Sequence, residues 1–441
     1  MTEPPLPPDD RIEQALPGSL WRDRTFVAVW SASTISIFGS LITRTALPFA
    51  AILVLAAGPF EIALIRSAEQ IAALVVGLFA GAWVDRLRRR PIMIWADLGR
   101  AVLLGSIPIA YLAGALVLGH LLVVSFAAAV LTTFFDVADR SYLPSIVPRD
   151  RLVGANSALT ASASVAEVTG FGIGGFLIQV LSAPIAIVID AVSFVVSAVL
   201  LGTIKRKEPP PKPVADREPV WREIRSGMGI VFRSPVLRAL ALAHGGTHIL
   251  WGIFGSAYLI FATQELGLGI AALGLIAGAG GLGSLAGSLA SPVLAKRFGI
   301  GRAMLLGMVF FTIGNALIPL APAGAVVLGA AFLVAQQLVG DSGATVYEIL
   351  EVSLAQSTSS PATLGRVNAT IGTFTTLLTL MGTIGGGIIA EIFGLRVAFA
   401  VGILGAIASI AVIWFSPVRH IRDAPVSTEA VMPGDESPLT E

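Results

Sequence analysis

Two histidines in the stretch HGGTH, His244 and His248, are four residues apart, which places both imidazoles on one face of a helix. Zinc hydrolases use this spacing with a glutamate directly after the first histidine. Gly245 occupies that position here, and the chain has no cysteine that could add a thiolate ligand. The sequence therefore predicts no metal site and no other cofactor. Three roles stay open for the pair: substrate binding, proton binding, or simple hydrogen bonding.

Charged residues inside long apolar runs are the second candidates for chemistry. Arg44, Arg66, Glu69 and Glu167 all lie in such runs. A charge near the centre of a bilayer costs roughly 2.5–3.5 kcal/mol on insertion scales, so it should face a partner or water. Arg44 and Glu69 flank a turn at 57–59 at similar distances, and a rise of about 1.5 Å per residue brings them to similar depths. We expect Arg44 to lie beside Glu69, and all four residues to serve proton coupling or substrate binding.

A third group is the stretch GAWVDRLRRR at 81–90, which holds four arginines within five positions. The chain around it has 441 residues, of which 55% are hydrophobic and 13% charged, with a mean hydropathy of +0.84. Soluble domains carry about 25% charged residues, and the apolar runs reach the ~20 residues that a helix needs to cross a bilayer. The prediction is an all-α polytopic membrane protein. A net charge of +1 gives no reason to expect a nucleic-acid partner.

Apolar stretches between polar, glycine or proline breaks predict twelve transmembrane helices. The expected ranges are 26–56, 60–83, 92–113, 120–139, 155–181, 185–204, 236–262, 270–294, 303–320, 324–345, 367–392 and 396–416. With the N-terminus placed inside, all but four of the 29 Lys and Arg fall in the inner loops and tails. By the positive-inside rule, both termini are cytoplasmic and the protein lies in the cell (inner, cytoplasmic) membrane.

The twelve helices divide into two six-helix bundles. We expect an N-terminal cytoplasmic tail over 1–24, a first bundle over 25–204, a cytoplasmic linker over 205–235, a second bundle over 236–416 and an acidic cytoplasmic tail over 417–441. The proline-rich start of the linker is typical of a spacer. Its WREIRSGMGIVF portion is amphipathic, so it is either a short helix on the membrane surface or an unstructured loop.

Short matches recur in the same order in the two halves, which indicates a parallel repeat. IFGS occurs at 37–40 and at 253–256, and VGANS at 153–157 matches GRVNA at 365–369. Three glycines also match at a constant offset: Gly170, Gly174 and Gly175 with Gly382, Gly386 and Gly387. Transporters built from repeats place their site near the midplane where the halves meet.

The stretch GAWVDRLRRRP resembles the signature loop of the major facilitator superfamily, where a glycine, an aspartate and several arginines join helices 2 and 3. The resemblance covers about 22–416, and WADLGRA, FFDVADRSYLPSIVP, VGANS and GRVNA are similar to segments of its drug-efflux and siderophore-export branches, the enterobactin exporters and macrolide efflux proteins. It implies an ion-pair network that gates the inner ends of the helices; alternatively, these charges only anchor helix ends. The residues concerned are Gly81, Asp85, Arg86, Arg89, Arg90, Asp97, Arg100, Asp136, Asp139 and Arg140.

Other parts of the chain resemble the same superfamily less completely. In the second half the corresponding loop, AKRFGIGR, has Ala295 near the place of Asp85, so such a gate would be one-sided. The glycines of helix 5 resemble the antiporter motif Gly-Pro-x-x-Gly-Gly, with Phe171 in place of the proline. The resemblance implies antiport, and close packing of helix 5 on a neighbour is the alternative.

Polar side chains recur at helical spacing on helices 1, 4, 7 and 10, which line the cavity in this superfamily. Trp251 in the seventh helix and Gln337 and Asp341 in the tenth belong to these stripes. Four stripes on the four expected helices favour a watered passage. The three residues therefore join the candidates for substrate or proton binding.

Together these features predict a secondary active transporter and not an enzyme. It would export amphipathic small molecules by alternating access, in exchange for protons. An ion gradient is the expected driving force because no nucleotide-binding motif is present. Its partners would be a small-molecule substrate, protons and the lipid bilayer, and it would act as a monomer. Two alternatives remain: an exporter of anionic siderophore-like compounds that uses Arg44 and Arg66 as the anion site, and a non-transporting membrane sensor or scaffold on the same fold.

Overall fold

The computed structural model describes residues 20–84, 87–148, 151–205, 208 and 220–423. Twelve long helices in these ranges correspond one to one to the twelve helices predicted from the apolar runs. The six helices of the N-terminal half are α1 (Arg24–Leu55), α2 (Pro59–Val84), α3 (Arg89–Leu112), α4 (Leu118–Ile146), α5 (Leu152–Leu181) and α6 (Ala183–Thr203).

The C-terminal half contains the other six long helices. They are α8 (Pro235–Ile260), α9 (Ile270–Phe298), α10 (Ile300–Leu320), α11 (Val326–Thr358), α12 (Pro361–Phe393) and α13 (Leu395–Phe415). A π-helical turn, η3 (Phe261–Glu265), continues α8, and short turns η1 (Leu20–Arg22) and η4 (Pro417–His420) flank the two sets. The amphipathic linker portion forms a helix, α7 (Val220–Arg233), so the helical alternative for WREIRSGMGIVF is the one observed.

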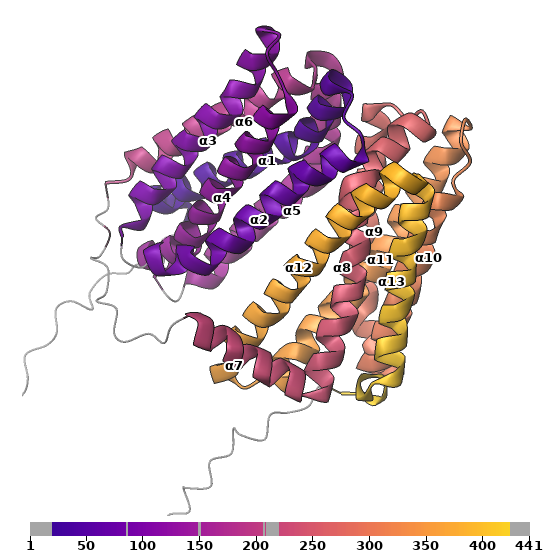
Figure 1. The fold of residues 1–441 in the computed structure, drawn as a ribbon. Coiled ribbons are helices and arrows are strands. Elements are labelled where there is room, and N and C mark those ends of the chain that lie inside the picture. Colours follow the sequence, from indigo (N-terminus) through magenta and orange to yellow (C-terminus); the bar gives the residue numbers. More distant parts are fainter. Residues whose placement is uncertain (1–19, 85–86, 149–150, 206–207, 209–219, 424–441) are drawn as a thin grey trace, which may run out of the picture.

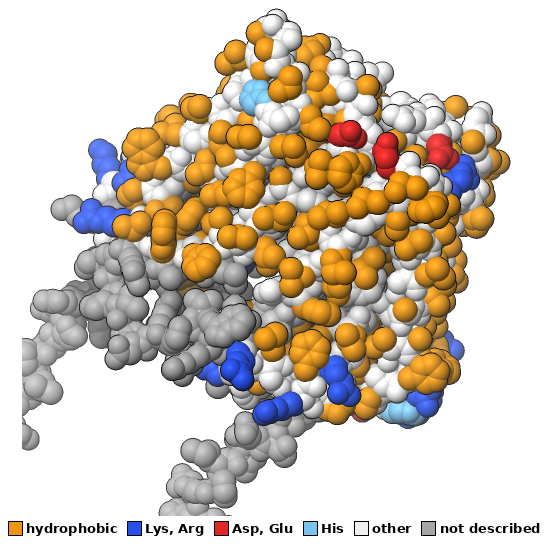
Figure 2. All heavy atoms as spheres, viewed as in Figure 1, with side chains coloured by type: hydrophobic (Ala, Val, Ile, Leu, Met, Phe, Trp, Pro, Cys, Tyr) orange, Lys and Arg blue, Asp and Glu red, His pale blue; other side chains and the backbone are white. Residues whose placement is uncertain are grey.

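Large apolar side chains cover much of the molecular surface, as a chain embedded in lipid requires (Figure 2). Leu275, Val327 and Phe415 are among those most exposed. Ten helices in the described ranges are long and apolar enough to cross a membrane, or up to eleven if the two bent segments of α5 count as one span. Lys and Arg side chains in this view gather at the end of the molecule where α7 lies.

The helices form two bundles that meet along two seams. In the N-terminal half α1 packs on α5 and α6, and in the C-terminal half α8 packs on α12 and α13. The halves meet where α2 contacts α12 and where α5 contacts α9. The ribbons of the two bundles converge at the end opposite α7 and diverge toward α7 (Figure 1).

Matched glycines make both seams possible and repeat their contacts in the two halves. The first two glycines of each set face the first long helix of their own half, and the third faces a helix of the other half. The sets are Gly170, Gly174 and Gly175 in α5, and Gly382, Gly386 and Gly387 in α12. A Cβ on Gly175 would lie 3.0 Å from the carbonyl oxygen of Ile270 in α9, and one on Gly387 would lie 2.5 Å from Cβ of Ala63 in α2.

Two helices are longer than predicted. The sequence places helix ends at 139 and 345, but α4 continues to Ile146 and α11 to Thr358, so the prediction of loops there is wrong. Both predicted ends fall where charged residues begin, and hydropathy alone treats charge as the end of a helix. The backbone hydrogen bonds of a helix do not depend on apolar side chains. The extra turns of α11 carry Tyr347, Glu348 and Glu351.

Candidate functional site

Arg44 on α1 and Glu167 on α5 form an ion pair near the middle of both helices. Arg44 Nη1 lies 3.9 Å from Glu167 Oε1, and the two side chains are 58% and 66% exposed. Neither residue is near a helix end. A charge inside the membrane is costly unless it is paired or hydrated, so exposed charges at this position indicate that the N-terminal half has an open, polar surface here.

Glu69 on α2 pairs with Arg66, one turn earlier on the same helix, at 3.3 Å. Arg66 Nη2 also donates a hydrogen bond to the main-chain carbonyl of Arg44, at 3.2 Å. Arg44 and Glu69 interact electrostatically, as expected, and Arg66 joins them by pairing with Glu69 and contacting the backbone of Arg44. The i,i+3 spacing explains the pairing of Arg66, since it brings the guanidinium to Glu69 within one helix.

A hydrogen bond beside this charged group connects the two halves. Gln70 Nε2 on α2 donates to Thr383 Oγ1 on α12 at 3.1 Å. Thr383 in turn donates to the carbonyl of Thr379, and Thr379 donates to the carbonyl of Thr375, both at 2.9 Å. The polar face of α12 therefore continues from the seam into the C-terminal half.

His244 and His248 lie together in the C-terminal half. Their ring centroids are 4.4 Å apart, and the ring planes are tilted by 33°. His248 Nδ1 is 3.1 Å from Thr379 Oγ1 on α12, and His244 Nδ1 is 3.9 Å from Glu351 Oε2 on α11. Within the described ranges no cluster of three or more His, Asp or Glu side chains is arranged to hold a metal ion.

The two histidines line a small pocket between α8, α10 and α11, with a cavity volume of about 10 Å³. Its aromatic and polar lining includes Trp251, Phe311, Tyr347 and Glu348. Gln337 and Asp341 lie elsewhere on α11, against α9, because a Cβ on Gly280 would collide with both side chains. The structure thus brings Trp251 together with the histidines and places Gln337 and Asp341 apart from them.

Asp97 and Arg100 form a buried ion pair on α3. The Arg100 guanidinium lies 4.0 Å from the ring centroid of Phe194 on α6 and 4.5 Å from that of Phe135 on α4. Stacking of this kind stabilises a desolvated guanidinium. Asp190 on α6, which is also buried, accepts a hydrogen bond from Ser193 and interacts electrostatically with Arg100. These charges lie in the packed interior of the N-terminal half.

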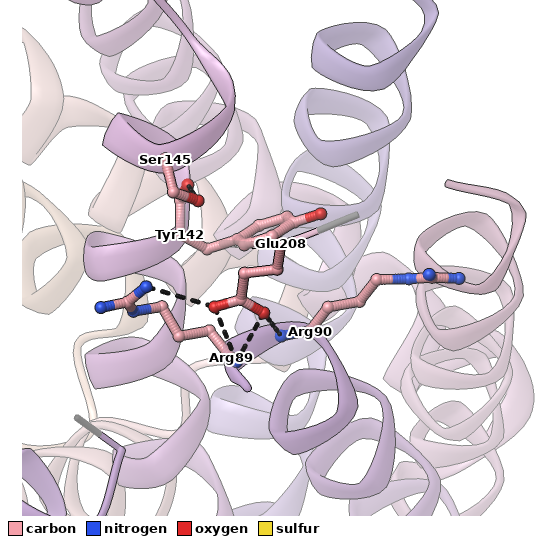
Figure 3. A network of polar contacts seen from close by, with 5 residues as sticks. All are labelled: Arg89, Arg90, Tyr142, Ser145 and Glu208. Carbon is pink, nitrogen blue, oxygen red and sulfur yellow. Dashed lines mark hydrogen bonds and ion pairs between the residues drawn. The ribbon is translucent and has the colours of Figure 1, made fainter. Parts of the chain in front are cut away.

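The arginines that begin α3 bind an acid from the linker (Figure 3). Glu208 accepts from the backbone N–H of Arg89 at 2.8 Å and of Arg90 at 3.3 Å, and its Oε1 lies 3.2 Å from Arg89 Nη1. Arg90 donates from its guanidinium to the carbonyls of Leu201 and Gly202 at the end of α6. Both arginines therefore hold the ends of α3 and α6 together.

The remaining residues of the expected gate network are distributed along α2 and α4. Gly81 lies in the last turn of α2, while Asp85 and Arg86 lie outside the described residues. Asp136 and Asp139 on α4 interact electrostatically with Arg140 and also with the pair on α3, Asp136 with Arg100 and Asp139 with Asp97. The structure therefore brings Asp97, Arg100, Asp136, Asp139 and Arg140 into one electrostatic group, whereas Arg89 and Arg90 make their contacts at the ends of α3 and α6.

Sequence reasoning missed three acidic residues that the structure places at key contacts: Asp190, Glu208 and Glu351. Asp190 is the single charged residue in the run of α6, so the rule that selected Glu69 would also have found it. Glu351 follows Glu348 by three residues and lies on the part of α11 that was predicted as a loop. Glu208 stands in a proline-rich linker, and no local pattern marks it.

Comparison with known proteins identifies the family. The model of the Major Facilitator Superfamily matches residues 29–336 and 240–435. The uncharacterized MFS-type transporter YfiS of Bacillus subtilis (strain 168) is 26% identical over 385 residues, which cover 84% of this chain and 88% of YfiS. The multidrug efflux pump Tap of Mycolicibacterium fortuitum is 24% identical over 351 residues, which cover 77% of this chain and 83% of Tap.

Solved structures agree on the fold. The crystal structure of a bacterial homologue of the iron transporter ferroportin in the inward-facing state superposes with a TM-score of 0.71 at 19% identity, covering 90% of this chain and 99% of that one. Family model, relatives and fold lead to the same conclusion. The chain belongs to the Major Facilitator Superfamily and is a membrane transporter of that type, not an enzyme.

Proposed function

We propose that the protein exports amphipathic small molecules by alternating access, in exchange for protons. The observation that carries this proposal is the position of the Arg44–Glu167 pair: it is charged, at mid-helix and exposed, in a molecule whose halves converge at one end and diverge at the other. A carrier of this kind needs a midplane site that water and substrate can reach from one side at a time. The efflux function of the relative Tap supports the direction of transport.

We further propose that the molecule lies in the inner membrane with both termini in the cytoplasm. The Lys and Arg side chains gather at the end where α7 lies, and basic residues favour the cytoplasmic side. The bundles diverge toward this same end, so the conformation described here would open to the cytoplasm. Substrate would enter between the halves from inside the cell.

Proton coupling is assigned to Glu167, with Glu69 as the second acid of the same group. Arg44 lies 3.9 Å from Glu167, and Arg66 lies 3.3 Å from Glu69. Movement of either arginine, or arrival of a substrate, changes the free energy of the ionised carboxylate relative to its protonated form. Each acid can then exchange its arginine partner for a proton during the cycle.

The test uses the full chain in proteoliposomes, with ethidium as an amphipathic probe and an imposed pH gradient. Wild-type protein should move ethidium in response to the gradient. Glu167→Gln should bind ethidium but lose that response, and Glu69→Gln and the double variant show whether the second acid contributes. An unchanged response in all three variants contradicts proton coupling at this group. Folded wild-type protein that moves no probe favours the sensor or scaffold alternative.

Export of an anionic, siderophore-like compound is a second candidate, because Arg44 is more than half exposed and Arg66 lies beside its backbone. Two guanidinium groups at one depth could bind carboxylate or catecholate oxygens. An anionic catecholate chelate should then compete with ethidium in wild-type protein and lose that competition in Arg44→Gln. Competition that survives the substitution removes Arg44 from an anion site.

A further inference from the structure

Glu351 is a carboxyl group in the interior of the C-terminal half. Its side chain is 5% exposed, and the basic group that it faces is Nδ1 of His244, at 3.9 Å. This distance lies within ion-pair range but is too long for a hydrogen bond. His244 Nδ1 is itself buried and makes no hydrogen bond in the described part of the chain.

The geometry decides how many protons this pair holds. An ionised Glu351 beside a neutral imidazole would be an uncompensated buried charge, which is very costly. An ion pair would need good geometry and further hydrogen bonds to offset the desolvation of two charges, and a separation of 3.9 Å supplies neither. The favourable form is neutral, with one proton on the Glu351 carboxyl and an uncharged His244.

Hydrogen bonding fixes the state of the second histidine. Thr379 uses its hydroxyl hydrogen for the carbonyl of Thr375, so its oxygen can only accept from His248. Neutral His248 therefore carries its hydrogen on Nδ1, and Nε2 remains as its basic nitrogen. His244 contacts both this histidine and Glu351, with ring centroids 4.4 Å apart and its Nδ1 3.9 Å from the carboxylate.

The groups that surround the pair leave one polar approach from solvent. The titratable neighbours in the pocket are His248 from α8 and Tyr347 and Glu348 from α11, whereas α10 contributes Met308 and Phe311. From α12 and α13 the nearby polar groups are the hydroxyls of Thr379 and of Ser409, which faces Gly246. Glu348 is exposed and lines the same pocket, so it connects the pair to water.

We propose that Glu351 and His244 hold one exchangeable proton, which is bound in the conformation described here and released when the C-terminal half becomes hydrated. This inference rests on the proposed function and adds a coupling site in the half opposite Glu167. The polar face of α12 links the two: His248 contacts Thr379, and one turn farther Thr383 accepts from Gln70, the neighbour of Glu69. Opening of the seam breaks the Gln70–Thr383 bond and so signals to both groups.

The first test detects the proton without any transport. Infrared difference spectra of the purified full-length protein in lipid nanodiscs, recorded between acidic and alkaline pH without substrate, should contain a carbonyl-stretch band from a protonated carboxylic acid. Glu351→Gln, which mimics the neutral form and should fold, removes part of this band. Glu351→Asp restores it at a shifted midpoint, and the control Glu391→Gln, at an exposed glutamate on α12, leaves it in place. Identical spectra for wild type and Glu351→Gln overturn the proposal.

The second test separates this site from the proposed function. Ethidium added to the same nanodiscs should release protons into a weakly buffered dye solution, and Glu351→Gln should release fewer. Wild-type protein that moves no probe, yet shows the infrared band that depends on Glu351, rejects the proposed function and keeps the proton site. Transport that still follows the pH gradient in Glu351→Gln but not in Glu167→Gln rejects this site and keeps the proposed function.

Discussion

The N-terminal half exposes its Arg44–Glu167 pair at the middle of α1 and α5, whereas the C-terminal half buries Glu351 beside His244 between α8 and α11. The helices around these groups pack alike, with glycines at matching positions of α5 and α12 facing equivalent neighbours. One half therefore offers a cation and an acid on an open surface, and the other offers two imidazoles beside a buried acid. The repeat preserves backbone packing, while the side chains that could do chemistry have diverged.

The starts of α3 and α10, the third long helix of each half, show the same contrast. In each half the segment after the sixth long helix returns to the start of the third. In the N-terminal half the carboxylate of Glu208 accepts from the backbone N–H groups of Arg89 and Arg90. In the C-terminal half the carbonyls of Arg422 and Ile421 accept from Ile300 and Gly301. A side-chain carboxylate accepts the hydrogen bonds of the first N–H groups of the helix in one half, and main-chain carbonyls accept them in the other.

The largest expected effect on stability comes from the glycines, and it tests whether the two halves are equally tightly packed. Gly386→Ala should destabilise the protein by about 1–3 kcal/mol, because its Cβ would collide with the backbone and side chain of Ile253. Gly174→Ala at the matching position should cost less, since its Cβ would lie 3.6 Å from Ile42 Cα. Thermal unfolding in detergent measures both, with Gly385→Ala as control because nothing lies within 4 Å of that position. Equal losses for Gly386→Ala and Gly174→Ala would mean that the halves tolerate added atoms equally.

The second prediction compares the contacts at the starts of α3 and α10. Glu208→Ala removes the acceptor from the first turn of α3 and should cost about 0.5–2 kcal/mol, as loss of a helix cap does. Arg422→Ala should cost much less, because the C-terminal half uses the carbonyl of Arg422 and not its side chain. Thermal unfolding again compares the pair. A larger loss for Arg422→Ala would reverse the contrast drawn here.

The third prediction addresses the hydrogen bond between the halves. Gln70→Leu and Thr383→Val should each remove about 0.5–1.5 kcal/mol from the α2–α12 seam and favour separation of the two halves there. The chain contains no cysteine, so Pro59→Cys gives a single labelling site at this seam. External labelling of Pro59→Cys should become faster in either background, while Arg88→Cys should stay unreactive from outside. Labelling of Arg88→Cys from outside would overturn the orientation proposed here.

The smallest expected effect on stability is that of the exposed pair. Arg44→Gln should change the free energy of unfolding by no more than about 1 kcal/mol, because exposed ion pairs contribute little. The same variant should lose transport driven by a pH gradient. A large loss of stability would mean that Arg44 holds the bundle together and would weaken the functional contrast between the halves.

Much of the fold could be predicted from the sequence, because a helix needs about 20 apolar residues to cross a bilayer and runs of this length are easily recognised. The charged residues at mid-helix stand out within these runs, but the ion pairs that they form could not be predicted. Arg66 pairs with Glu69 through helical spacing, and Arg44 reaches Glu167 on a helix far away in the sequence. Glu351 could not be recognised because hydropathy predicts that its helix ends at 345. Glu208 could not be recognised because its contacts depend on how the linker folds back onto the start of α3.

The two seams contain contacts between small residues: Gly175 lies against Gly274, and Gly387 against Ala63. The atoms nearest to these two glycines are backbone atoms or a Cβ, so no long side chain interlocks at either contact. The barrier to opening is then set by the area in contact and the Gln70–Thr383 bond. Because little side-chain rearrangement is needed at these contacts, the rate of the transport cycle would then depend mainly on the bound substrate.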